Sequence, residues 1–544
     1  MEPPPDAVEP PGNTRPMLAW IGLPLVELYA AVAVAAISHR QLFLDAPVAL
    51  PLVGLAVPPL LLAIATPLLM LAPLATAALR RGQAGDASVA PPVRAIVLLI
   101  VPLLILLQVQ LVFLPLHAEP LTWFHRLTFL LGLGLAGQGI RSPMPKRAIA
   151  IRRLASAALA IYSCGLATFP GEWLDTQLGP IQRPAVLRPP STLDLQGQSF
   201  APPAFGAPDA PGPSLRGRKL EGAKFFLADL RQADFAGARL DGADFVQADL
   251  RGASFHGASL SGASFGNGAL DGADFSDAIL TGADLNGALQ GLNFAGADLR
   301  GTLFGFGVPT HLDGANLARA RLDGAVIEAV YLQGADLRGA SLVGATIASM
   351  AGYGTKAMLD GANLDGAHLQ GAALQGASLA GASLKQAQLW RTTGMPHLHA
   401  TDATAIDRTT RPAIDATALR RAAANNPFQD EQRERLALLD AADPPPQATP
   451  SDVWPAAPPS ATALAKVLAD LICAPPPEDA EAPRPPYVAR GLIANGRLAA
   501  TGAEIGRVAA RMKAAQKTPS DCPGVAGFNE SDWAALEALV AAAH

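Results

Sequence analysis

The sequence is short of the residues that usually carry chemistry. Its 544 residues include three cysteines and nine histidines, and only 16% are charged. The cysteines do not have the spacing of metal ligands. The formal net charge is −5, and no basic patch with interleaved aromatic residues occurs. We therefore expect no nucleic-acid partner.

Catalytic signatures are also missing. Phosphate loops of the GxxxxGK(S/T) kind, GxSxG and HExxH do not occur. Gly132, Gly134 and Gly137 fit the dinucleotide pattern GxGxxG, but no strand precedes them, and no acidic residue lies between Glu119 and Glu172 to bind a ribose. We interpret these glycines as close-packing positions of a membrane helix.

One histidine pair, His397 and His399, has the composition of a metal site but lacks a clear third ligand. We interpret it as a solvent-exposed pair. The sequence thus predicts no catalytic, cofactor-binding or metal-binding residue, and no enzyme.

Apolar residues, in contrast, are concentrated near the N-terminus. A spanning helix needs about 20 mainly apolar residues, and three runs reach that length while two are marginal. We predict a transmembrane domain of four or five helices over residues 17–170, with a short extended loop at Leu44–Pro58. The runs are Leu18–Ile37, Pro58–Leu79, Ala95–Leu116, Phe124–Ile140 and Ile149–Phe169.

Ionisable and amide side chains inside these runs are the main functional candidates of this region. Glu27 lies in the first run, where an ionisable group is costly, and Gln108 and Gln110 lie in the third. A buried contact between Glu27 and a glutamine would fix the bundle, and a role in ion or proton movement is the alternative. His117 and His125 lie near a membrane edge and are isolated.

The distribution of basic residues bears on orientation. Five spans with the N-terminus inside place nine Lys or Arg residues in cytoplasmic segments and only Arg40 and Arg126 in outer loops, as the positive-inside rule requires. This favours a repeat region on the periplasmic side of a bacterial inner membrane. If Phe124–Ile140 lies flat, or Ile149–Phe169 does not cross, the repeat region is cytoplasmic instead.

From Leu220 to Leu389 the sequence has a period of five. Of 33 repeat centres, nearly all Leu, Phe or Ile, 26 have an Ala two residues earlier. Neither a helix nor a strand has this period. The motif, as in Ala243-Asp244-Phe245, resembles the pentapeptide-repeat family, whose consensus is Ala-(Asp/Asn)-Leu-x-x. The resemblance implies an all-β, right-handed quadrilateral β-helix over residues 215–390, with one pentapeptide on each side of the coil.

Three further segments extend the resemblance to a membrane-anchored bacterial subgroup that has a multi-span N-terminal domain. They are Pro120–Leu127, Phe169–Leu174 and Ser214–Arg218. That subgroup implies no activity. Some pentapeptide-repeat proteins mimic DNA with strongly acidic rods. Residues 215–395 hold 14 basic and 17 acidic residues, so the net charge of this rod produces only a weak electrostatic field.

Phenylalanine alternates with leucine at the early centres. Because ten residues make half a coil, we predict one stack of Phe225, Phe245 and Phe265 and an opposite stack of Phe235, Phe255 and Phe275. Later centres are Leu and Ile, which predicts a slimmer second half. The period is interrupted at 305–309 and 349–354, where loops bulge out as binding elements or as tolerated insertions. The Asp residues that precede many centres are assigned turn and solvation roles.

The remaining segments are linkers and a tail. Residues 1–16 are predicted to be disordered, 171–214 to be a Pro-rich linker, and 391–544 to be a tail that is partly helical and partly disordered. Helices are expected at Ala416–Ala442, broken at Pro427, and at Ala461–Ile472, Ala489–Lys517 and Ser531–Ala543, with Ser531 as the last cap. We expect this tail to cover the open end of the β-helix.

Two of the three cysteines lie in this tail. Cys473 and Cys522 can form a disulfide if the tail lies outside the cytoplasm, and are otherwise two free thiols. Cys164 lies in an apolar run and is expected to be inert.

Taken together, these features favour a membrane-anchored, non-enzymatic scaffold whose rod meets an unknown protein partner or the cell envelope. The lipid bilayer is the other expected partner, an oligomer is compatible with the sequence, and no cofactor is expected. The alternative is a transporter-like or sensor protein whose spans act and whose rod regulates them.

Overall fold

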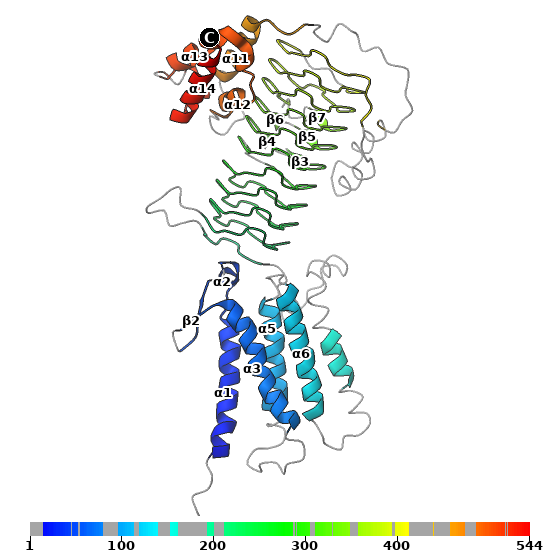
Figure 1. Cartoon of the computed structure of the whole chain (residues 1–544), viewed down its shortest axis with the longest axis vertical. Coiled ribbons are helices and arrows are strands. Elements are labelled where there is room, and N and C mark those ends of the chain that lie inside the picture. Colours follow the sequence, from blue (N-terminus) through cyan, green and yellow to red (C-terminus); the bar gives the residue numbers. More distant parts are fainter. Residues whose placement is uncertain are drawn as a thin grey trace, which may run out of the picture. The chain divides into compact units, whose positions relative to one another are not determined.

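The computed structural model divides the chain into two compact units, Met1–Asp194 and Leu195–His544, which are described separately. Figure 1 shows helices in the first unit and a stack of coils followed by helices in the second. The structure describes residues 15–44, 46–52, 55–79, 96–113, 119–139, 153–161, 193–200, 212–286, 289, 291–304, 310–328, 330–348, 357–393, 398–412, 439, 457–473, 486–516, 518 and 521–543.

Unit 1 is a helical bundle. Helices α3, α5 and α6 pack on one another, and α1 packs mainly on α5. Residues 153–161 are also helical. The helices are α1 (Arg15–Ala35), α2 (His39–Leu44), α3 (Pro59–Leu79), η1 (Ile96–Ile100, a π-helical turn), α5 (Val101–Phe113) and α6 (Glu119–Gly139).

Four of the five predicted apolar runs coincide with helices, and of the fifth, Ile149–Phe169, the structure describes only residues 153–161, which are helical. Among the described residues, two segments are long and apolar enough to cross a bilayer, Pro59–Thr76 and Ile96–Phe113, while Gly22–Ala35 in α1 is shorter. Length and composition alone do not distinguish a span from the core helix of a soluble protein. The number of spans therefore stays a prediction.

The segment predicted as an extended loop, Leu44–Pro58, contains a small hairpin. Strand β1 (Val48–Ala49) pairs antiparallel with β2 (Ala56–Val57), and Leu52 adopts a left-handed conformation in the turn. The loop lies between α2 and α3.

Unit 2 begins with a four-sided β-helix. Successive parallel bridges at Lys219, Lys224, Asp229 and Asp234 each pair with a residue 20 positions later, so each pentapeptide forms one side. Backbone N–H groups of buried centres donate to the next coil, as from Leu240 to Ser259 O at 2.6 Å. The backbone groups at the bridge positions are thereby paired between successive coils.

Left-handed residues turn the corners between sides. Ala243 N–H donates to Leu240 O at 3.0 Å across a turn in which Gly242 has φ +68°. This left-handed conformation costs free energy for a residue that has a Cβ, which explains why Gly recurs two residues after a repeat centre. Carboxylates before the centres close the same turns. Asp244 Oδ1, for example, accepts the N–H of Val246 at 3.0 Å, which confirms the predicted turn role.

The two phenylalanine stacks are present as predicted. Phe225 and Phe245 stack with centroids 4.8 Å apart, as do Phe255 and Phe275. The two stacks also meet across the core edge to face, as between Phe245 and Phe255 at 5.6 Å and 85°. The coil is therefore narrow enough for each ring to contact rings above, below and opposite.

The ladder extends beyond residues 215–390 at both ends. Ser199 bridges to Asp229, within the segment predicted as linker, and Asp407 bridges to Gln388, within the predicted tail. At both ends of the ladder the five-residue period is harder to recognise in the sequence, because neighbouring segments without the repeat interrupt it.

Longer strands occur only in the second half of the described coils. Strands β3 (Leu303–Phe304), β5 (Val326–Glu328) and β7 (Thr346–Ala348) form one parallel sheet. Strands β4 (Thr310–His311) and β6 (Val330–Tyr331) form the stack on the next side.

From residue 212 onward, the changes of period fall at the corner between these two stacks, which we call the insertion corner, whereas the spacing of 30 between Ser199 and Asp229 arises at another corner. Bridge spacing shifts from 20 to 19 residues across 286–288, to 23 across 305–309, to 27 across 349–356, and again to 19 between Thr393 and His399. The coil accommodates each change without losing its register on the other three corners. The predicted bulges themselves lie outside the described residues.

The chain ends in a C-terminal bundle. Its core contains Leu468, Leu492, Leu498, Ile505 and Leu536. The helices are α11 (Ala461–Cys473), α12 (Tyr487–Ala494), η5 (Ala499–Glu504), α13 (Ile505–Ala514), η7 (Pro523–Val525) and α14 (Glu530–Ala542).

Three details of the tail differ from the sequence prediction. Segment Ala489–Lys517 is not one helix, because α12 ends at Asn495 and Gly502 has φ +54°. The cap of α14 is Asn529 rather than Ser531, since Asn529 and Asp532 form a reciprocal capping box. Most of the helix predicted at 416–442 lies outside the described residues.

Cys473 and Cys522 form a disulfide that ties the end of α11 to the segment before η7. This resolves the choice that the sequence left open. Cys164 lies outside the described residues.

Candidate functional site

The best-built contact surface of unit 2 is a column of glycines at one corner of the coil, which we call the glycine corner. It consists of Gly291, Gly314, Gly334, Gly361 and Gly381, all with positive φ. Because glycine lacks a Cβ, a partner backbone can approach this column closely.

Helix α12 lies along the glycine corner. A Cβ on Gly314 would meet the carbonyl oxygen of Tyr487 at 2.1 Å, and one on Gly334 would meet that of Val488 at 2.8 Å. On the helix side, a Cβ on Gly491 would meet Gly314 Cα and Gly334 O, each at 2.5 Å. Glycines on both partners thus allow backbone-to-backbone packing.

Asn495 and Arg497, which follow α12, bind main-chain oxygens of the same corner. Asn495 Nδ2 donates to Gly334 O at 2.9 Å and to Gly361 O at 3.1 Å. Arg497 donates from Nη2 to Gly381 O at 2.8 Å and to Ala382 O at 3.0 Å. Both side chains are buried. Burial lowers the pKa of Arg497, and the charges of Asp365 and Asp402 oppose that shift.

Further contacts extend the interface at both ends. Tyr487 donates its hydroxyl to Asp271 Oδ1 at 3.1 Å. Leu464 and Leu468 of α11 pack on Gly381. The C-terminal bundle therefore lies along one corner over several coils. The described contacts of the bundle are lateral, and the predicted cover of the open end stays a prediction, because residues 413–438 and 440–456 of the tail lie outside the described residues.

In the earlier coils the same corner carries charge instead. Arg231 forms ion pairs with Asp229 at 2.9 Å and Asp249 at 3.6 Å, and Arg251 pairs with Asp249 at 2.6 Å. The hydrogen bond from Arg231 lowers the pKa of Asp229. These side chains are partly exposed, so the corner changes from a charged surface to a covered one along the coil.

Beside the insertion corner, the outward side chains of β4 and β6 are buried. His311 stacks on Tyr331 with centroids 4.4 Å apart, and its Nδ1 lies 3.6 Å from Asp313 Oδ2. Burial raises the pKa of Asp313 to about 8, although the N–H of Gln333 donates to its carboxylate. No signal in the sequence singled out this pair.

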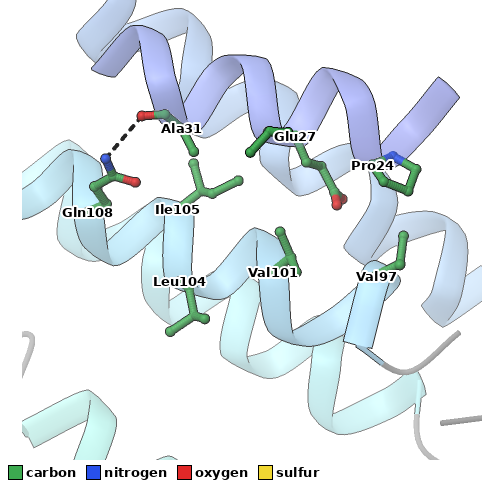
Figure 2. A pocket seen from close by; sticks show the side chains of 9 residues that line it. Pro24, Glu27, Ala31, Val97, Val101, Leu104, Ile105 and Gln108 are labelled. Atoms are coloured by element: carbon green, nitrogen blue, oxygen red, sulfur yellow. Dashed lines mark hydrogen bonds between the residues drawn. The ribbon is translucent and has the colours of Figure 1, made fainter. Parts of the chain in front are cut away.

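Unit 1 places the predicted Glu27 in a cavity between α1 and the η1–α5 helix, shown in Figure 2. Gln108 lines the same cavity but donates to Ala31 O at 3.1 Å rather than to Glu27. Within the described residues neither carboxylate oxygen has a hydrogen-bond partner. The predicted contact of Glu27 with Gln108 is therefore absent there. Gln110 is buried elsewhere on α5.

The other candidates predicted from the sequence include His125 and Gly132, which contact neighbouring helices of unit 1. His125 is buried, and its Nε2 lies 2.9 Å from Ala63 O. Gly132 lies inside α6, where a Cβ would meet Leu106 at 2.9 Å, which confirms its close-packing role, whereas nothing lies within 4 Å of a Cβ on Gly134, so the prediction is wrong for that glycine. The described residues contain no group of three or more potential metal ligands. His117 and His397 lie outside the described residues.

Comparison with known proteins identifies the repeats. The family model of pentapeptide repeats matches in eight copies over residues 228–305, 310–347 and 357–392. This family folds as a right-handed β-helix, in agreement with the four-sided coil. The model matches nothing N-terminal of residue 228, so the predicted membrane-anchored subgroup has no support from it. A search of the curated proteins finds no match.

Several solved structures are similar over the repeat region. HetL, a pentapeptide-repeat protein involved in heterocyst differentiation regulation in the cyanobacterium Nostoc sp. strain PCC 7120, is 29% identical. The match covers 36% of this chain and 86% of HetL, with a TM-score of 0.16. QnrB1, a plasmid-mediated fluoroquinolone resistance protein, is 20% identical, with 40% and 92% covered and a TM-score of 0.18.

A pentapeptide-repeat protein of the Arabidopsis thaliana thylakoid lumen is 30% identical, with 24% of this chain and 63% of that chain covered and a TM-score of 0.10. These TM-scores are low, so the assignment of the repeats rests on the family model and on the coil geometry.

Proposed function

Because residues 228–392 form a pentapeptide-repeat domain, we propose that the chain is a membrane-anchored, non-enzymatic scaffold that presents this domain to a protein partner or to the cell envelope. The observation that carries the scaffold role is the insertion corner. In the coils from residue 212 onward, each of the four changes of period falls on it, and only the earlier spacing of 30 between Ser199 and Asp229 falls elsewhere in the described coils. In solenoids, insertions confined to one side commonly form the binding face.

The surface of unit 1 supports the membrane anchor. Among the described residues, 24 large hydrophobic side chains are exposed, of which 22 lie between Leu25 and Ile161 and two, Leu227 and Ile279, lie in unit 2. A core helix of a soluble protein buries such residues, whereas a bundle in lipid exposes them. The bilayer is thus the partner that we propose for unit 1.

The disulfide supports a periplasmic rod. Disulfides persist in oxidising compartments and are rare in the cytosol. The bond between Cys473 and Cys522 lies in the same unit as the rod. This agrees with the orientation that the basic residues favour, in which five spans place the rod outside the cytoplasm of a bacterium.

Shortening the insertion corner tests the scaffold role. Deleting 350–356 from the full chain restores the spacing of 20 between Tyr331 and Met358. In vivo crosslinking should then lose the partner adducts of the wild-type rod, while the chain still fractionates with membranes. Arg231→Ala at the charged corner is the control and should keep the adducts. Unchanged adducts in the deletion variant would contradict the scaffold role of this corner.

A transporter-like or sensor protein is the second candidate, and Glu27 is the observation that favours it. An unpartnered carboxylate inside an apolar bundle is costly unless it serves a function. If Glu27→Gln abolished an ion flux or a signalling output but left partner adducts unchanged, the spans would be the active part of the molecule.

A further inference from the structure

We propose that the cavity beside Glu27 is a binding site for a lipophilic amine, a molecule with one ammonium group and an apolar body. The inference rests on the proposed membrane setting of unit 1 and adds a ligand to it. The cavity has a volume of about 360 Å³, at the lower end of the range for small-molecule sites.

The charge of the site comes from Glu27. The residue is 1% exposed, and neither of its carboxylate oxygens has a partner within the described residues. Figure 2 shows the side chain extending from α1 into the space before Val97 and Val101. A buried carboxylate without a partner costs several kcal/mol by order of magnitude, and a bound cation would remove that cost.

The walls define the rest of the ligand. Apart from Glu27 and Gln108, they are apolar, with Pro24, Val101 and Ile105 among them. A divalent metal ion needs six or more oxygen ligands, or four ligands of nitrogen and sulfur, and these walls supply one carboxylate and one amide. In a ligand with one ammonium group on an apolar body, the ammonium group pairs with the Glu27 carboxylate and the apolar body packs against the apolar walls.

The cavity opens toward the outer surface of the bundle. Leu28 and Leu104 line it and are 61% and 60% exposed. In the proposed membrane setting this surface faces lipid, so a ligand that partitions into the bilayer can enter from the side. A hydrated inorganic cation has no comparable route through an apolar mouth.

Irregular helices form both walls of the cavity. Pro24 interrupts the hydrogen bonding of α1, and the π-helical turn η1 ends at Ile100, two residues before Pro102 of α5. Prolines and π-turns widen a helix locally, and π-turns frequently occur at functional sites. These features keep the two helices from closing on the carboxylate.

Photocrosslinking of the full-length chain in detergent tests the site. The probe is a decylamine that carries a diazirine, and adducts are mapped by peptide mass spectrometry. We expect saturable adducts on α1 and η1–α5 that unlabelled decylamine removes and decanol of the same length does not. Labelling in Glu27→Gln should fall by about tenfold or more, since loss of a buried charge partner weakens binding at least that much.

Two further variants keep the test decisive. Glu530→Gln makes the same chemical change on an exposed turn of α14 and should label like wild type. Ala31→Leu keeps the carboxylate but fills the cavity, and it should also lose the adducts. Adducts that persist in Glu27→Gln, or that decanol removes equally well, would overturn the amine site.

The membrane setting is measured by alkaline carbonate extraction of the membranes from which each variant is later solubilised. A chain that stays in the membrane fraction but labels equally with and without Glu27 contradicts the amine site alone. A chain released into the soluble fraction contradicts the anchor, and with it the lipid-side entry on which this inference rests.

Discussion

The early and late coils of the β-helix share one backbone geometry but use it differently. From residue 212 to residue 286 the period is strictly five, phenylalanines stack in the core, and the corner at Arg231 and Arg251 is charged. Beyond it, leucines fill most of the core after Phe294 and Phe304, the period changes at the insertion corner, and glycines bind the C-terminal bundle. The early coils serve as a regular stem, and the late coils carry the contacts.

The largest expected difference lies in the core. Phe255→Ala should lower the local free energy of unfolding by about 3–5 kcal/mol, because Phe255 contacts rings on four sides. Leu342→Ala in the late coils should cost less, at about 2–3 kcal/mol. Hydrogen exchange of coil amides measures both. Equal costs would mean that ring stacking adds nothing beyond the burial of apolar area.

Much of this contrast could be predicted from the sequence. The five-residue period and the Phe alternation determine which side chains a narrow coil buries, so the coil and both stacks followed from Leu220–Phe275 alone. The docking of α12 could not be predicted, since Asn495 and Arg497 bind main-chain oxygens that no residue type reveals.

Glu27 shows the same limit in unit 1. Its position in an apolar run marked it as a candidate, but its surroundings depend on how α1 and α5 cross. Gln108 was the expected partner and binds Ala31 O instead, so the cavity became visible only in three dimensions.

The next prediction concerns the glycine contact that only the late coils make. Gly491→Ala places a methyl group within 2.5 Å of Gly314 and Gly334 and should weaken bundle docking by about 1–3 kcal/mol. Gly506→Ala in α13 is the matched control. Nothing lies within 4 Å of its Cβ, so the helix should gain about 1 kcal/mol. Limited proteolysis between rod and bundle measures docking, and the same response in both variants would refute the close backbone contact.

A smaller effect is expected at Asp313. The folded chain holds its proton up to about pH 8, whereas an unfolded Asp releases it near pH 4. The unfolded state thus binds fewer protons between these values, and the contribution of Asp313 to the free energy of unfolding falls as the pH rises through this window. Asp313→Asn keeps an acceptor for Gln333 and should stabilise the late coils by about 1 kcal/mol or more at pH 7.

Urea unfolding of wild type and Asp313→Asn at several pH values checks this prediction. The gain should grow from about pH 5 to about pH 8 and then level off. His311 faces the same carboxylate at 3.6 Å, so His311→Gln serves as the control for its charge. A gain that does not change with pH would show that Asp313 is already ionised in the folded chain.

The smallest effect is expected at the charged corner of the early coils. Arg231→Ala removes partly exposed ion pairs and should lower the unfolding temperature less than any of the changes above, with the loss falling further in high salt. Thermal unfolding at two salt concentrations measures it. A loss as large as that of Gly491→Ala would mean that the early corner is also a docking surface.

The central claim is that a lipid-embedded unit 1 holds the rod in an oxidising compartment. Thiol labelling of Cys473 and Cys522 in spheroplasts, in a Cys164→Ser background, tests it most directly. We predict that the chain is in the membrane fraction and that both thiols react with an impermeant label only after an impermeant reductant has been added. Free thiols that no impermeant reagent reaches in intact spheroplasts would contradict this account.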